Sequence, residues 1–86
     1  MKKIIFTDHA LLQMHRRGIT EKDVREIIRN PGQIEDVRPG RVIMQSCFLT
    51  GKPEKELLLR VFVDVSEDNY EVVTVYRTSK IDKYWR

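Results

Sequence analysis

The N-terminal part of the chain carries its apolar side chains at helical spacing. A first helix is predicted over residues 8–17, because Thr7 is a favourable N-cap and Gly18 a favourable C-terminal stop. A second helix is predicted between the capping-box-like stretch 20–23 and the breaker Asn30-Pro31-Gly32. The predicted apolar stripes of the two helices are Ala10, Leu11, Met14, Val24, Ile27 and Ile28.

After residue 32 the apolar positions alternate, which indicates strands separated by polar turns. Residues 2–6 form an extended lead-in, and the tail 79–86 either adds a helical turn or packs down through Tyr84 and Trp85. The predicted fold is therefore α+β in a single domain of residues 1–86, with the two N-terminal helices packed on a mainly antiparallel sheet of about four strands. The four predicted strands are 33–37, 42–49, 56–65 and 70–78.

Alternation sorts the last two predicted strands into two unlike faces. The aliphatic face should be buried under the helices, and it consists of Leu57, Leu59, Val61, Val63, Val73 and Val75. The opposite face should carry Arg60, Phe62, Val72, Thr74, Tyr76 and Thr78, joined by Gln45 and Cys47 if the preceding strand is in register. Arginine, hydroxyl and aromatic groups on one face are typical of a binding surface, although an ordinary solvent-exposed face can have the same composition.

Composition adds a mildly basic balance, with 16 Lys and Arg against 13 Asp and Glu and a formal net charge of +3 in 86 residues. This charge fits nucleic acid as a partner and fits an ordinary basic surface equally well. The lone Cys47 cannot form an internal disulfide, which is typical of a reducing cytoplasm. Because the apolar runs are too short for a signal peptide or a membrane span, a cytoplasmic location without membrane association is expected.

On the first predicted helix, His9, Gln13 and Arg17 are spaced four apart and so form one row on the helix surface. His9 and His15 are not at the i, i+4 spacing of a metal pair, so neither a metal nor another cofactor is expected. Most single helix histidines are surface residues rather than catalysts. The sequence also has no glycine-rich phosphate loop, and Cys47 lies in mid-strand, where packing is its common role.

Several short motifs together resemble a large, mostly uncharacterised family of small bacterial domains grouped with the RelE/ParE-like toxins. The fold of those toxins is shared with barnase-like and EndoU-like ribonucleases. The resemblance spans roughly residues 6 to 78, and its family often has a basic residue where this chain has Gln13. It is carried by Thr7-Asp8-His9-Ala10, Met14, Arg17-Gly18-Ile19-Thr20, Asp23-Val24, Asn30-Pro31-Gly32, Leu59-Arg60-Val61-Phe62-Val63 and Val72-Val73-Thr74-Val75-Tyr76.

The resemblance implies a RelE-like fold and a toxin-like, metal-independent endoribonuclease of a toxin-antitoxin type system. RNA would be its substrate and an antitoxin protein a partner. Attack of an RNA 2′-hydroxyl on the adjacent phosphate needs a base, an acid and positive charge near the phosphorane. The resemblance assigns catalytic roles to His9, Arg60 and Thr74, and substrate-binding roles to Arg17 and Tyr76.

Two other functions remain open, because a shared fold does not fix an activity. The domain could be a RelE/ParE-like protein that has lost catalysis and acts by binding another protein. It could also be a small structural or interaction module. Convergence of His9, Arg60 and Thr74 on one patch would favour the enzyme.

Overall fold

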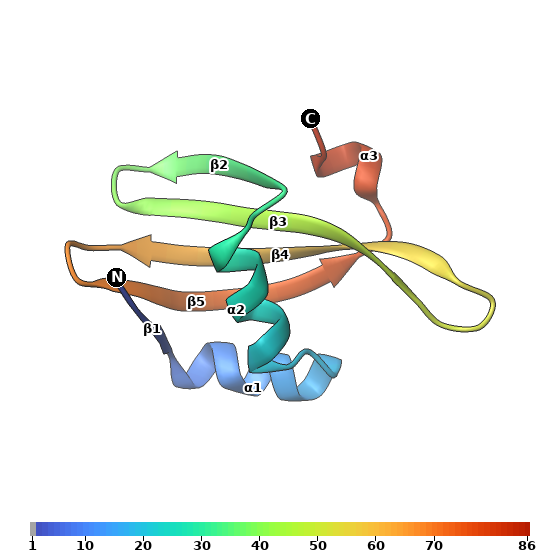
Figure 1. Cartoon of the computed structure of the whole chain (residues 1–86), viewed down its shortest axis with the longest axis horizontal. Helices are drawn as coiled ribbons and strands as arrows, with labels where there is room; N and C mark the ends of the chain where they lie inside the picture. Colours follow the sequence, from blue (N-terminus) through green and yellow to red (C-terminus); the bar gives the residue numbers. More distant parts are fainter. Residues whose placement is uncertain (1) are drawn as a thin grey trace.

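The computed structural model in Figure 1 describes residues 2–86. Two helices near the N-terminus are followed by a run of antiparallel strands and a short helix. In chain order the elements are β1 (Lys3–Phe6), α1 (Asp8–Arg17), α2 (Glu21–Arg29), β2 (Gln33–Arg38), β3 (Arg41–Thr50), β4 (Lys55–Val65), β5 (Asn69–Thr78) and α3 (Ile81–Tyr84).

The strands form one five-stranded sheet in the order β1-β5-β4-β3-β2. Strands β2 to β5 pair antiparallel with their neighbours, as expected from the short turns between them. The extended lead-in is the additional strand, because Lys3 to Phe6 pair in parallel with Asn69 to Val72 of β5. The α+β class is confirmed, with five strands in a mixed, mostly antiparallel sheet.

Both helices begin and end at the predicted signals. The Thr7 side chain accepts a hydrogen bond from the Ala10 amide at 3.1 Å, and Gly18 ends α1 in the left-handed region at φ 66°. A complete capping box starts α2, because the Asp23 amide donates to the Thr20 hydroxyl and the Thr20 amide donates to the Asp23 carboxylate. Local sequence thus determines where both helices lie along the chain.

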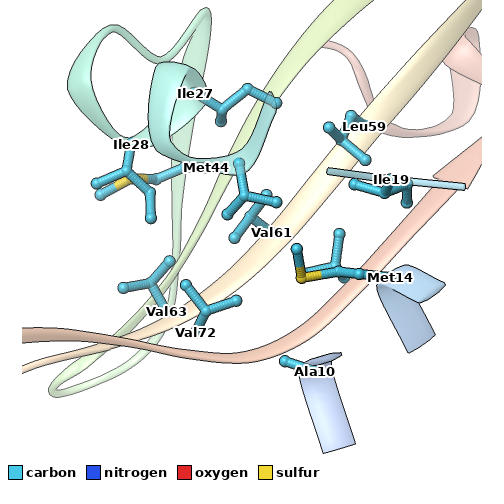
Figure 2. Close-up of a cluster of buried hydrophobic side chains, with 12 residues drawn as sticks. Ala10, Met14, Ile19, Ile27, Ile28, Met44, Leu59, Val61, Val63 and Val72 are labelled. Atoms are coloured by element: carbon cyan, nitrogen blue, oxygen red, sulfur yellow. The ribbon is translucent and has the colours of Figure 1, made fainter. Parts of the chain in front are cut away.

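The helices lie on one side of the sheet, with α2 crossing in front of it and α1 running along β5 (Figure 1). Apolar side chains of both helices meet one face of the central strands, as Figure 2 shows. This burial of aliphatic surface is the main source of stability in so small a domain. The buried cluster consists of Ala10, Met14, Ile19, Val24, Ile27, Ile28, Met44, Leu59, Val61, Val63, Val72 and Val75.

Two predicted core positions are wrong. Leu11 is 39% exposed, because α1 buries only the narrow stripe of Ala10 and Met14. Val73 is half-buried, and Val72 takes the core position instead. The cause is a bulge: Phe62 pairs with Thr74 while the next residue of β4 pairs with Val72, so the alternation of β5 shifts by one residue there.

The chain after β5 turns back over the sheet and ends in α3, whose Tyr84 reaches the face opposite α1 and α2. Leu58, which alternation also places on that face, is fully buried. Both faces of the central strands are therefore covered in part. Within residues 2–86, none of the helices combines the length and apolar character needed to cross a membrane.

Leu59 on β4 tests the core assignment. It is 4% exposed, so Leu59→Ala should lower the free energy of unfolding by about 2–5 kcal/mol through lost burial and a residual cavity. The matched control is Leu49→Ala on β3, where the side chain is 64% exposed and the expected change is below about 0.5 kcal/mol. Urea denaturation of the three proteins measures both values. Equal losses in the two variants would contradict the assigned core.

Candidate functional site

A polar row crosses four strands on the sheet face opposite α1 and α2. Gln33 of β2 pairs with Gln45 of β3, Gln45 pairs with Arg60 of β4, and Arg60 pairs with Tyr76 of β5. Directly paired residues project to the same side of a sheet, so these four side chains form a continuous line. Glu35 lies two residues after Gln33 and therefore on the same face. The face that alternation assigned to Arg60, Gln45 and Tyr76 is thus present as a connected surface.

Arg60 lies at the centre of this row and is only 5% exposed. Its Nε donates to the Gln45 Oε1 at 3.0 Å, one terminal nitrogen donates to the Tyr76 hydroxyl, and the other donates to the Glu35 Oε2 at 3.1 Å. Burying a guanidinium is costly unless it is paired and hydrogen-bonded. These partners compensate the buried charge and hold the plane of the guanidinium in one orientation.

Tyr84 of α3 covers the Arg60 guanidinium. Its ring centroid lies 4.0 Å from the Arg60 Cζ, close enough for a cation–π contact, and its edge meets the Tyr76 ring at a centroid distance of 6.4 Å. Burial raises the pKa of Tyr76, which therefore stays protonated at neutral pH. A hydrogen bond with the Tyr76 hydroxyl lowers the pKa of Tyr84. The two phenols and the guanidinium form one packed, polar cluster.

Glu35 is the functional candidate that the sequence analysis missed. Its Oε2 accepts from Arg60 at 3.1 Å and its Oε1 accepts from Arg86 at 2.8 Å, while its side chain keeps 28% of its surface exposed. A partly exposed carboxylate is a candidate for proton transfer where a substrate proton can come within hydrogen-bond reach of it. The alternation of β2 already placed Glu35 on the face of Gln33, but its approach to Arg60 depends on how β2, β3 and β4 pair.

The structure brings some of the predicted site residues together and leaves others apart. Arg60 and Tyr76 are in direct contact, and Thr74 lies two residues before Tyr76 on the same face, half-buried. Arg17 of α1 donates to the Val75 carbonyl at 3.2 Å, so it is tied to the backbone of β5. His9 is exposed on α1, which packs along β5 on the face of the sheet opposite Arg60 and Thr74, so His9 does not lie on the same face as those two residues. The functional roles of all five residues stay predictions.

A second concavity lies on the side of the sheet that carries the helices. It is a groove of about 720 Å³ with apolar walls that include Ile19 and Phe48, and with Arg29 and Arg77 among its charged lining residues. The five predicted site residues lie outside this lining. Cys47 also borders the groove, and burial raises the pKa of its thiol, which makes it a poor nucleophile at neutral pH.

No group of three or more His, Cys, Asp and Glu side chains within residues 2–86 is arranged to hold a metal ion. The polar groups that this surface offers a ligand are those of Arg60, its hydrogen-bond partners and the neighbouring hydroxyls. The donors and acceptors offered by guanidinium, carboxylate, amide and phenol groups suit an anionic ligand that also carries flat apolar groups.

Comparison with known proteins identifies a family over most of the chain. The model of a domain of unknown function, DUF4258, matches residues 6–77, and the chain belongs to this family. No curated protein matches the chain. No solved structure matches it either. The matched region begins at the end of β1 and reaches into the last residues of β5, so it includes both helices and the whole polar row.

A double-mutant cycle on Glu35 and Arg60 tests whether this ion pair organises the polar row. The single variants Glu35→Gln and Arg60→Met and the double variant should give an interaction energy of about 1–3 kcal/mol, because removal of one partner leaves a largely desolvated group unpaired. Urea denaturation supplies the four free energies of unfolding.

The matched control is the exposed pair of Glu21 and Arg25 on α2, replaced in the same way. Its side chains are 54% and 37% exposed, so an interaction energy of only about 0.2–0.5 kcal/mol is expected. Similar values for the two pairs would show that Glu35 and Arg60 interact no more strongly than an ordinary surface pair.

Proposed function

We propose that this member of the DUF4258 family is a toxin-like, metal-independent endoribonuclease that binds RNA on the Arg60 surface. This surface is defined as Glu35, Gln45, Arg60, Thr74 and Tyr76. One observation carries the proposal: a nearly buried arginine is held rigidly beside a carboxylate and hydroxyl groups on a face turned away from the main core. The resemblance to RelE/ParE-like toxins supports the same activity.

The guanidinium of Arg60 has the donors that a phosphate needs. Among the residues described, its bonds to Tyr76 and Glu35 use one N–H on each terminal nitrogen, which leaves a second N–H on each. Two donors in a fixed plane match the oxygens of a phosphodiester. The hydroxyl of Thr74 lies on the same face and would add a neutral donor. Arg60 would thus stabilise the negative charge that develops on the phosphorane.

The proposed reaction is cleavage by the adjacent 2′-hydroxyl. Glu35 takes the 2′-hydroxyl proton, the 2′-oxygen bonds to phosphorus, and the bond from phosphorus to the 5′-oxygen breaks. The leaving 5′-oxygen receives a proton from His9. Because α1 packs along β5 on the other face of the sheet, the RNA would have to bend around the β5 edge for the scissile phosphate to reach both His9 and Arg60. The products are a 2′,3′-cyclic phosphate and a 5′-hydroxyl. Arg17 and Tyr76 would bind flanking parts of the RNA.

A second candidate function is protein binding at the groove on the helix side. The apolar walls at Ile19 and Phe48 would accept an apolar segment. The charged lining has both signs, with Arg29 and Arg77 beside Asp23 and Glu26, so it would pair with flanks that also carry both charges. An antitoxin-type partner of this chemistry would leave the Arg60 surface free. This function becomes the leading one if the isolated domain leaves RNA intact.

Purified protein should cleave a fluorescently labelled single-stranded RNA in the presence of excess EDTA. Glu35→Gln and His9→Ala should each lower the single-turnover rate by about 10²–10⁴-fold, because each removes a proton-transfer group. Arg60→Lys should lower it by about 10²–10³-fold through loss of the planar fork. The matched control is His15→Ala, an exposed histidine on the same helix, which should cleave like wild type.

Expression of the same variants in a bacterial host gives an independent measurement, because an active protein should arrest growth and fragment cellular RNA. Intact RNA and normal growth in cells that express folded wild type would contradict the proposed endoribonuclease activity. If wild type cleaves and His9→Ala cleaves equally fast, the activity stands and His9 is not its acid. Restoration of a lost activity by one divalent ion after EDTA treatment would contradict metal independence.

A further inference from the structure

The segment of residues 79–86 covers the Arg60 surface through contacts with four strands, β2 to β5. The side-chain amide of Gln33 pairs with the backbone of Arg86, donating to its carbonyl at 2.5 Å and accepting from its amide at 3.1 Å. The Gln45 amide donates to the Tyr84 carbonyl at 3.1 Å. A side chain that binds both backbone groups of one residue holds a peptide in place as a neighbouring strand does.

Three side chains of the segment complete this contact. The Tyr84 ring stacks on the Arg60 guanidinium, and the Arg86 guanidinium pairs with Glu35. The Trp85 ring packs over Gly32, where an added Cβ would approach it to 2.9 Å. Glycine at this position therefore leaves room for the ring. The proposed phosphate-binding group and the proposed base are both occupied by this segment.

These contacts resemble those that a single-stranded RNA would make. A flat ring on a guanidinium takes the place of a stacked base, and the Arg86 cation occupies the carboxylate that is proposed to act on the 2′-hydroxyl. RNA and the segment therefore need the same atoms. We propose that residues 79–86 form a displaceable cap, so that RNA binds the Arg60 surface only when the segment has left it; this inference rests on the proposed function.

The segment is built to detach without unfolding the sheet. Its helix α3 has only four residues and no side-chain cap at its N-terminus, and so short a helix is not stable by itself. Ser79 and Lys80, which connect it to β5, are exposed, and the Arg86 side chain keeps 77% of its surface exposed. Docking thus depends on the few contacts to β2, β3, β4 and the Tyr76 ring of β5. The helix-side core stays in place when they break.

The test measures RNA affinity in full-length variants that weaken the cap. The probe is a single-stranded oligonucleotide of 2′-O-methyl RNA, which keeps the bases and phosphates but lacks the attacking hydroxyl. Gln33→Ala and Arg86→Ala should each bind it about 3- to 10-fold more tightly than wild type, because a larger fraction of the protein is uncapped. The matched control is Lys80→Ala, which removes the same charge from the same segment and should bind slightly more weakly.

The sign of the Arg86→Ala effect separates a cap from a simple RNA-binding tail. Loss of a cation from a tail that holds RNA weakens binding, whereas loss of a cap contact strengthens it. The chain's one tryptophan, Trp85, supplies a second readout. Its fluorescence should become more accessible to acrylamide in Gln33→Ala without RNA, and in wild type when RNA is added.

Any other result contradicts the proposal that residues 79–86 are a displaceable cap. If wild type binds RNA while acrylamide access to Trp85 stays unchanged, or if Gln33→Ala and Arg86→Ala bind as weakly as Lys80→Ala, the segment does not compete with RNA. The proposed function survives both of these results. If wild type and the uncapped variants all fail to bind the probe, the cap and the RNA-binding function fall together.

Discussion

The burial of a positive charge at Arg60 is the constraint on which the rest of this sheet depends. A guanidinium that is 5% exposed needs acceptors on nearly every side, and here they come from three other strands and from α3. A slip of β2 by one residue would turn Glu35 to the other face and leave the cation without its carboxylate. The arginine therefore helps to specify the register of β2, whose apolar side chains Ile34 and Val37 are exposed and define it only weakly.

The two faces of β4 carry different kinds of side chain. Val61 and its aliphatic neighbours face the helices and supply the apolar burial, while Arg60 on the adjacent position faces the polar row. A side chain on the central strand of a well-packed sheet has little freedom to move, so its donors keep a fixed direction. The same core that holds the fold together thus positions the guanidinium.

Sequence signals within a few residues of each helix end predicted the helices, because helix ends are determined by local hydrogen bonds. The caps at Thr7 and Thr20 and the stop at Gly18 were sufficient for both helices, since each acts within one turn. The pairing of β1 with β5 and the bulge at Val73 escaped prediction, because they depend on segments distant along the chain. The sequence of a short, parallel edge strand such as β1 does not indicate which strand it will pair with.

The same distinction holds for the candidate site. Alternation placed Arg60, Thr74 and Tyr76 on one face, and the structure joins two of them directly. Glu35 was missed because its proximity to Arg60 depends on two strand registers at once. The contact between Tyr84 and Arg60 was missed for a different reason. The tail is short and has no hydrophobic periodicity, so its sequence does not indicate which surface it packs against.

The contacts that residues 79–86 make also limit which ligand could take their place. A competitor has to return an aromatic face to Arg60 in place of Tyr84, and it has to offer oxygen acceptors to the N–H groups beneath. A duplex keeps its bases stacked inside and presents only phosphates, whereas a single strand can splay a base onto the guanidinium. Among nucleic acids, the proposed surface therefore favours a single strand over a duplex, because only an unpaired base can replace the Tyr84 ring on the Arg60 guanidinium.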